Sequence, residues 1–298
     1  MVNFYPTHFT LASGAVPGTD HDCCPFDFRD RMQAAAGAGV TTIGLYYPDI
    51  ANVLRTYSLH DMRRILDDTG ITVMEYEWLN DWCYDGERRL PADAALELIL
   101  RTADVLGGQH IKASDFMNRT VRLEQASERF SHLCRKVRPS GLNVMFEMLP
   151  SGFSNFPSVE LSLALVRGAG EVNGGILLDS WHLTRTHTAL ADLAAALRPG
   201  DLIAAELNDG LLADPEDPDD AVRNHRLLVG EGEFDLAGIV SVLARHGFSG
   251  PWGIEILSEQ LRRCSLDDVA CRTVATTRAF FSQFEPPADA AGYPMEIA

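Results

Sequence analysis

One complete strand–helix–strand unit lies in residues 142–181, which read LNVMFEMLPSGFSNFPSVELSLALVRGAGEVNGGILLDSW. Residues 142–149 form an apolar run with the length of a buried strand, and residues 175–181 form a second one. Between them, residues 158–170 show the spacing of an amphipathic helix that ends at a glycine. This order predicts two parallel strands joined by a crossover helix.

The same unit recurs along the chain of 298 residues. Six further strands are expected at 8–11, 41–46, 71–78, 110–114, 201–209 and 252–257. Seven further helices are expected at 28–39, 59–70, 91–108, 123–141, 189–200, 235–248 and 266–284. Eight such units favour an α/β fold of the (β/α)8 TIM barrel class over an open sheet, and no GxGxxG loop follows the first strand. We expect a single domain over residues 1–298, with 285–298 as a C-terminal tail.

The composition is that of an ordinary globular protein with a strong acidic excess. The chain has 42 acidic and 25 basic residues and a formal net charge of −17. This charge argues against nucleic acid and anionic membranes as partners, because both repel an acidic surface. It can reflect a cation site or simply a solvated acidic surface.

The cysteines and the N-terminus give information on the cellular compartment of the protein. The six cysteines form no CxxC pair, which argues against a zinc knuckle and fits a reduced intracellular protein. The N-terminus lacks the basic region and long apolar core of a signal peptide. No apolar run approaches the roughly 18 residues that span a bilayer. We therefore expect a cytoplasmic protein.

Acidic residues stand near the ends of four consecutive predicted strands. These residues are Glu147, Asp179, Glu206 (with Asp209 close by) and Glu255. The carboxyl ends of barrel strands meet at one mouth, so these side chains are expected to converge. Converging buried carboxylates repel one another, and a divalent cation is the simplest compensation. Each acid alone could instead cap a helix or form a salt bridge.

Other side chains could reach the same mouth and bind substrate. Five of them lie at strand ends or in the Asp- and Pro-rich loop 210–234: His8, Lys112, His182, Arg223 and Arg226. For each, the alternative is a surface residue or a salt-bridge partner. Four aromatic side chains could wall the pocket, although core packing is the alternative for each: Trp78, Phe116, Trp181 and Trp252.

An ordered set of motifs covers about residues 141–258. It comprises FEMLP around Glu147, LLDSWH with Asp179 and His182, ELND, and VGEGEFDLAGIVSVLARHGFSGPWGIEILSE. In this order the motifs resemble the xylose isomerase-like superfamily of sugar isomerases and epimerases.

The resemblance implies a divalent metal at the mouth of the barrel. Glu147, Asp179 and Glu255 match three metal ligands of the family by position. The fourth ligand is usually a histidine, and Glu206 stands in its place. If Glu206 binds, the all-carboxylate set favours Mn²⁺, or Mg²⁺, over Zn²⁺.

The resemblance also implies a reaction. It points to a metal-dependent isomerase or epimerase of a small sugar, keto-sugar or polyol that works through an enediolate, with Glu147 and Glu255 as the acid/base pair. His182 matches a histidine that contacts substrate, and Arg223 and Arg226 are both candidates for a substrate-binding arginine. Because relatives often pair, a homodimer is an expectation.

Three alternatives stay open. The same enediolate with a leaving group on the β-carbon would make the enzyme a dehydratase or lyase. Glu206 in place of the histidine favours a non-catalytic sugar-binding barrel. A DNA-repair endonuclease on this barrel is disfavoured by the net charge of −17 and by the lack of a His-rich zinc set.

Overall fold

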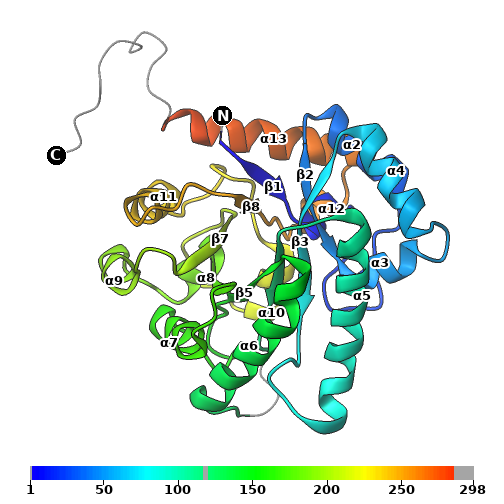
Figure 1. The fold of residues 1–298 in the computed structure, drawn as a ribbon. Helices are drawn as coiled ribbons and strands as arrows, with labels where there is room; N and C mark the ends of the chain where they lie inside the picture. Colours follow the sequence, from blue (N-terminus) through cyan, green and yellow to red (C-terminus); the bar gives the residue numbers. More distant parts are fainter. Residues whose placement is uncertain (1, 117–119, 285–298) are drawn as a thin grey trace, which may run out of the picture.

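The computed structural model describes residues 2–116 and 120–284, so the expected tail at 285–298 lies outside the described residues. Eight parallel strands form one sheet in the order β1-β8-β7-β6-β5-β4-β3-β2. They are β1 (Phe4–Pro6), β2 (Thr42–Tyr46), β3 (Thr72–Leu79), β4 (His110–Ala113), β5 (Asn143–Glu147), β6 (Gly174–Asp179), β7 (Leu202–Leu207) and β8 (Trp252–Ile254). The two end strands, β1 and β2, lie side by side, so the sheet curls into a nearly closed barrel (Figure 1). The predicted barrel fold is confirmed.

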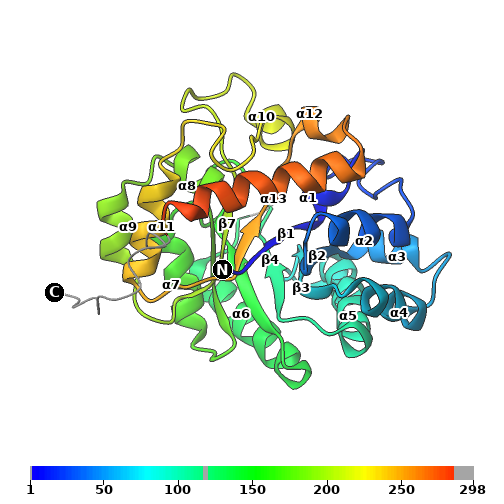
Figure 2. The same ribbon diagram turned by 90° about the horizontal axis from the view of Figure 1, so that it is seen from above.

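Helices surround the barrel (Figures 1 and 2). The eight predicted helices are α2 (Phe28–Gly37), α4 (Leu59–Thr69), α5 (Leu90–Leu106), α6 (Leu123–Val137), α7 (Val159–Ala169), α9 (Leu190–Ala196), α11 (Leu236–Arg245) and α13 (Leu266–Ser282). Shorter helices are α1 (His8–Leu11), α3 (Tyr47–Val53), α8 (Ser180–Arg185), α10 (Pro218–Asn224) and α12 (Glu259–Arg262), with 3₁₀ turns η1 (Gly86–Arg89) and η2 (Arg138–Ser140). Of these, α1, α3, α8, α10 and α12 follow the ends of strands and build the rim above the barrel.

Local sequence explains where a typical outer helix begins and ends. At the start of α4, Ser58 Oγ accepts a hydrogen bond from the Asp61 backbone N–H at 3.1 Å, and the Asp61 carboxylate accepts one from the Ser58 N–H at 3.0 Å. This reciprocal capping satisfies two backbone donors that have no partner within the helix. Gly70 ends the helix with a φ of 69°, which glycine adopts without strain.

The predicted first strand is wrong. The strand is Phe4–Pro6, and residues 8–11 form the single-turn helix α1. Tyr5 is fully buried inside the barrel, whereas Thr10 Oγ1 donates a hydrogen bond of 2.7 Å to the Ile254 carbonyl and holds α1 against the end of β8. Four residues are too few for apolar periodicity to distinguish one helical turn from a strand.

The inward positions change from apolar to acidic along the strands. Side chains of a strand alternate between the two faces of the sheet, so every second residue points into the barrel. One fully buried inner layer is apolar and consists of Met145, Leu177 and Ala204. Two residues further along the same strands, the corresponding positions are acidic: Glu147, Asp179 and Glu206.

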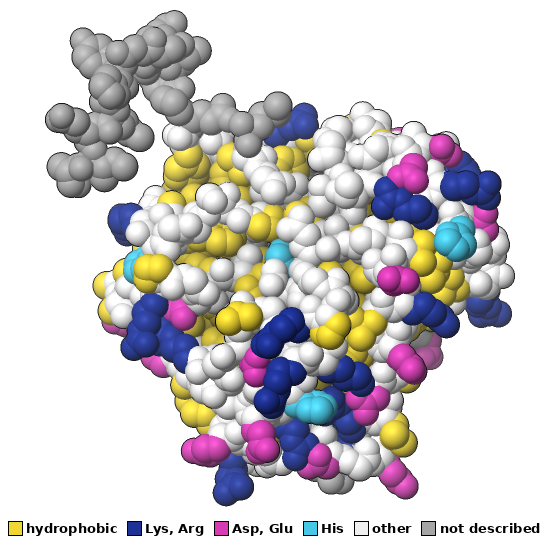
Figure 3. All heavy atoms as spheres, viewed as in Figure 1, with side chains coloured by type: hydrophobic (Ala, Val, Ile, Leu, Met, Phe, Trp, Pro, Cys, Tyr) yellow, Lys and Arg dark blue, Asp and Glu magenta, His cyan; other side chains and the backbone are white. Residues whose placement is uncertain are grey.

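The outer surface shows no single-sign patch on the face seen in Figure 3. Acidic and basic side chains are interspersed there, and hydrophobic side chains gather near α11 and α13. Among the described residues, none of the helices has the length and apolar character needed to cross a membrane.

The buried His110 at the start of β4 predicts acid sensitivity of the fold. It is 4% exposed, neither ring nitrogen has a hydrogen-bond partner among the described residues, and burial lowers the pKa of His110 to about 4. The unfolded chain binds this proton near pH 6.5, so the free energy of unfolding falls as the pH drops from about 6.5 to about 4, by about 3 kcal/mol from this residue. In His110→Leu, the urea midpoint should change less between pH 7.5 and pH 5 than it does in the parent.

The exposed His132 provides the matched control. His132→Leu should keep the full pH dependence of the parent. An equal acid-induced loss in the parent and in His110→Leu would contradict the assignment.

Candidate active site

Four acidic side chains meet at the mouth of the barrel. Glu147 and Asp179 end β5 and β6, Glu206 lies in β7, and Glu255 directly follows β8. One carboxylate oxygen from each lies within 4.8 Å of the others, and all four residues are at most 6% exposed. Two oxygens that bind one ion at about 2.0–2.4 Å are at most about 4.8 Å apart. The spacing therefore fits a single divalent cation.

The surroundings of Glu206 provide a second test of this fit. Its Oε1 lies 2.7 Å from Lys112 Nζ. Its Oε2 has no hydrogen-bond partner among the described residues, although Glu206 is fully buried. A buried carboxylate oxygen without a partner is costly, and a bound cation would remove that cost.

The Lys112 ammonium lies at the centre of the acidic residues. Besides Glu206, its Nζ lies 2.8 Å from Glu255 Oε1, 3.1 Å from Glu77 Oε2 and 4.0 Å from Glu75 Oε1. Burial lowers the pKa of Lys112, but the facing carboxylates, led by Glu206, outweigh burial and hold it well above its usual range. These carboxylates therefore favour the charged form of Lys112.

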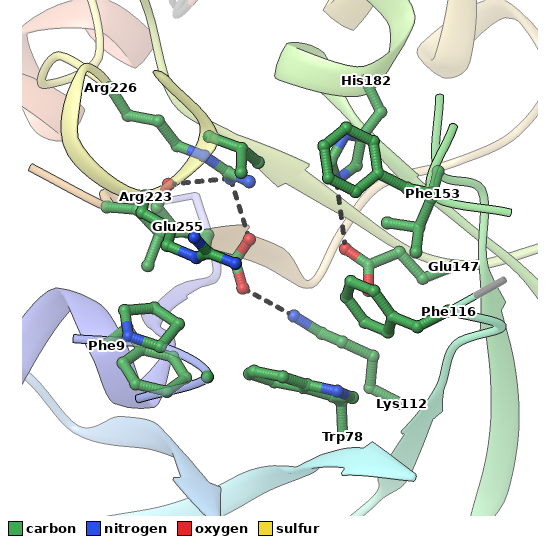
Figure 4. A pocket seen from close by; sticks show the side chains of 15 residues that line it. Phe9, Trp78, Lys112, Phe116, Glu147, Phe153, His182, Arg223, Arg226 and Glu255 are labelled. Carbon is green, nitrogen blue, oxygen red and sulfur yellow. Dashed lines mark hydrogen bonds and ion pairs between the residues drawn. The ribbon is translucent and has the colours of Figure 1, made fainter. Parts of the chain in front are cut away.

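The structure places the two candidate arginines differently. Arg226 is 1% exposed, and its Nη1 lies 3.0 Å from Asp179 Oδ2 and 2.8 Å from Glu255 Oε2. Arg223, from α10, lines the pocket and has no ion pair among the described residues (Figure 4). Arg226 thus neutralises the acids, whereas Arg223 offers an unneutralised guanidinium at the mouth.

Acidic groups outnumber basic ones at this site. The buried carboxylates are Glu75, Glu77, Glu147, Asp179, Glu206 and Glu255, and the buried cations facing them are Lys112 and Arg226. Burial raises the pKa of Glu75 to about 8, and burial together with the Glu255 charge raises the pKa of Glu206 well above its usual range. With six buried acids and two buried cations, the site lacks positive charge, and a divalent ion would reduce this deficit.

Glu147 has a different environment. Burial alone would raise its pKa, but the Lys112 charge and a hydrogen bond with His182 outweigh burial and lower the pKa of Glu147 to about 2. Ser114 Oγ donates a hydrogen bond of 2.7 Å to Glu147 Oε2, and His182 Nε2 lies 3.5 Å from Glu147 Oε1. Glu147 is therefore ionised, with a histidine beside it.

The DSWH segment positions His182 through the helix that follows β6. Asp179 Oδ1 accepts hydrogen bonds from the backbone N–H groups of Trp181 at 2.6 Å and His182 at 3.4 Å, which starts α8 at the strand end. His182 Nδ1 has no partner among the described residues. With Glu147 and Asp179, His182 forms a second group that could hold a metal ion.

The pocket above these groups has aromatic walls. The side chains of Phe9, Trp78, Phe116 and Phe153 surround Lys112, Glu147 and Glu255 (Figure 4). Trp181 and Trp252 pack against other aromatic rings, Phe234 at 5.8 Å and Phe248 at 4.9 Å. The pocket therefore has charged side chains at its base and aromatic side chains around them.

His8 lies apart from this lining. Its neighbour Phe9 forms the wall, while His8 Nδ1 faces Asp49 Oδ2 at 3.9 Å. Burial is the main reason that the pKa of His8 is lowered to about 4. Substrate binding by His8 stays a prediction.

From the sequence, Glu75 could be expected to reach the mouth, whereas the direction of Glu77 stayed undecided and Phe9 and Phe153 were not identified as wall residues. Strand alternation signals that Glu75 and Glu77 share the inner face of β3. No local pattern marks the two phenylalanines, because they lie in segments beyond the strands.

The fold and the site agree with a known family. Residues 32–276 match the family model described as Xylose isomerase-like TIM barrel. The chain belongs to this family. This confirms the resemblance expected from the sequence.

Similar proteins include a curated 3-dehydroshikimate dehydratase from Pseudomonas aeruginosa, which is 27% identical over 246 residues. The match covers 78% of this chain and 36% of that protein, so the chain spans about a third of the relative's length. Among solved structures, the IOLI protein with a bound zinc atom has a TM-score of 0.81 at 15% identity, covering 95% of this chain and 99% of that one.

A D-allulose 3-epimerase from Methylomonas sp., in complex with D-allulose, has a TM-score of 0.68 at 15% identity, covering 93% of this chain and 96% of that one. At these identities the two structural likenesses show the fold alone. The curated relative is a dehydratase, and one of the solved structures that share the fold is an epimerase.

Proposed function

We propose that this chain is a divalent-metal-dependent enzyme that enolises a small polyhydroxylated ketone, and that loss of water from the enolate follows. The observation that carries the proposal is the convergence of four buried carboxylates within 4.8 Å beneath an open pocket. One of the four, Glu147, is ionised and lies 3.5 Å from His182, a pair suited to proton transfer.

Glu147, Asp179, Glu206 and Glu255 would hold the ion. An all-oxygen set favours Mn²⁺ or Mg²⁺. A bound divalent ion would polarise the ketone and acidify the adjacent C–H bond.

Glu147 would accept the proton from that C–H bond. A carboxylate with a pKa of about 2 is a weak base, so the transfer depends on the acidified bond. His182, at 3.5 Å from Glu147, would relay the proton to the departing hydroxyl group. Arg223 and the aromatic walls would orient the substrate, a small carbohydrate or a related cyclic polyol.

The two sides of the site differ, and this difference supports elimination over epimerisation. Glu255 Oε1 lies 2.8 Å from Lys112, and Glu255 Oε2 lies 2.8 Å from Arg226. A carboxylate held between two cations stays ionised and is a poor proton donor, whereas inversion of a carbon centre needs a base on one face and a proton donor on the other. The likeness to a 3-dehydroshikimate dehydratase supports the same choice.

Epimerisation or isomerisation is the second candidate function. Glu147 and Glu255 lie on opposite sides of the pocket, which is the arrangement that a two-base epimerase requires (Figure 4). The D-allulose 3-epimerase shares the fold.

One experiment separates the two reactions. The chain would be stripped of metal, reloaded with Mn²⁺ and incubated in D₂O with 3-dehydroshikimate and, separately, with D-allulose. Elimination predicts a product lighter by one water, formed only by the reloaded protein. An epimer that carries one deuterium would favour the second candidate, and neither product nor deuterium exchange from either compound would contradict both reactions on these substrates.

A further inference from the structure

Lys112 and Glu206 form an ion pair across the barrel interior. Lys112 comes from β4 and Glu206 from β7, and the two side chains are 1% and 0% exposed. Their closest atoms are 2.7 Å apart. The chain has only one other lysine, Lys136, which lies on the surface with a side chain that is 43% exposed. An ammonium at this depth requires compensating carboxylates, because burying an isolated charge is costly.

The two oxygens of Glu206 have different surroundings. Lys112 Nζ lies 2.7 Å from Oε1 as an ion pair without hydrogen-bond geometry, and neither Oε1 nor Oε2 has a hydrogen-bond partner among the described residues. Glu206 also offers an oxygen within 4.8 Å of oxygens from Glu147, Asp179 and Glu255. The carboxylate can therefore pair with the ammonium through one oxygen and bind an ion through the other, since a carboxylate has about four acceptor positions.

We propose that Lys112 and Glu206 act as one unit that supplies a metal ligand with no net charge. This inference rests on the metal site of the proposed function. Lys112 is in this view a positioning residue: it orients Glu206 and offsets its charge, so that Glu206 contributes a ligand oxygen without adding net negative charge around the ion. The ammonium is fixed by its other contacts, 2.8 Å to Glu255 and 3.1 Å to Glu77.

If the two residues act as one unit, substitutions of Glu206 and of Lys112 should change Mn²⁺ affinity in opposite directions. Glu206→His supplies a good neutral ligand but leaves the Lys112 charge beside the ion, so Mn²⁺ affinity should fall at least about tenfold, since a unit charge a few ångströms away in a protein interior has an effect of this size. Lys112→Met removes the competing charge, so Mn²⁺ affinity should rise by at least about the same factor. In Lys112→Met/Glu206→His the effects should cancel, and affinity should return to within a few-fold of the parent.

The measurement is Mn²⁺ affinity by calorimetry on the full chain without substrate, with the Mn²⁺-induced shift in Tm as a second readout. Lys136→Met is the matched control and should bind as the parent does. If Glu206→His binds Mn²⁺ as tightly as the parent, or if the double variant is no better than Glu206→His, the unit does not exist. Should Lys112→Met not fold, Lys112→Gln and the single Glu206→His variant still decide the question. A parent chain that binds no Mn²⁺ would instead overturn the metal site itself.

Discussion

Glu147→Gln is expected to lower the rate of α-proton exchange from substrate by about 10²–10⁴-fold at saturating Mn²⁺, which is the usual contribution of a positioned base. Glutamine has nearly the same shape, and its amide oxygen can still accept the 2.7 Å hydrogen bond from Ser114. It cannot accept the proton, and it no longer pairs with His182. The measurement is loss of substrate signal in D₂O by NMR, on the substrate that the parent turns over.

Ser114→Ala is the matched control for this prediction. It removes one hydrogen bond to Glu147 Oε2 but keeps the carboxylate. Its exchange rate should fall less than about tenfold, since one such bond contributes about 1 kcal/mol. Exchange in Glu147→Gln within tenfold of the parent would show that another group removes the proton.

The alternation of side chains explains why much of this site could be predicted from sequence. Glu147, Asp179 and Glu206 each stand two residues after an inward apolar position on their strand. Once parallel strands are recognised, the geometry of a barrel brings such residues to one mouth. Glu255 follows the same logic, because it directly follows β8.

The charge pairing within the site could not be predicted. Lys112 meets Glu206 and Glu255 across the barrel, from strands far apart in the sequence. Sequence places these residues at strand ends but does not say which side chains touch. For the same reason the sequence could not distinguish the roles of Arg223 and Arg226. Their positions depend on how α10 and the residues after it lie over the rim.

Short segments limited the prediction of the fold. The first strand has three residues and the first helix has four. Such lengths carry too little periodicity for a reading from sequence. Their identity is decided by tertiary contacts, such as the 2.7 Å hydrogen bond between Thr10 and the Ile254 carbonyl. His8 accordingly begins α1, two residues after the end of β1.

Asp179→Asn is expected to have the largest effect on both metal binding and stability. Asp179 is fully buried and accepts hydrogen bonds from the Trp181 N–H at 2.6 Å, from Asn208 Nδ2 at 2.9 and 3.0 Å, and from Arg226 at 3.0 Å. An asparagine would turn an NH₂ group toward one of these donors and leave Arg226 with one carboxylate fewer. Breaking a buried ion pair in this way costs about 3–5 kcal/mol.

Mn²⁺ affinity in Asp179→Asn should fall at least about 100-fold, since a charged ligand is lost from an acid-rich site. Asp209→Asn is the matched control, because Asp209 is also a buried acid beyond β7 but accepts from the backbone N–H groups of Gly210 at 2.8 Å, Phe234 at 3.0 Å and Gly230 at 3.1 Å. It should lose stability in urea and keep its Mn²⁺ affinity. The two variants separate the cost of disturbing a buried carboxylate from the loss of a ligand, so an equal fall in affinity in both would place the ion elsewhere than at Asp179.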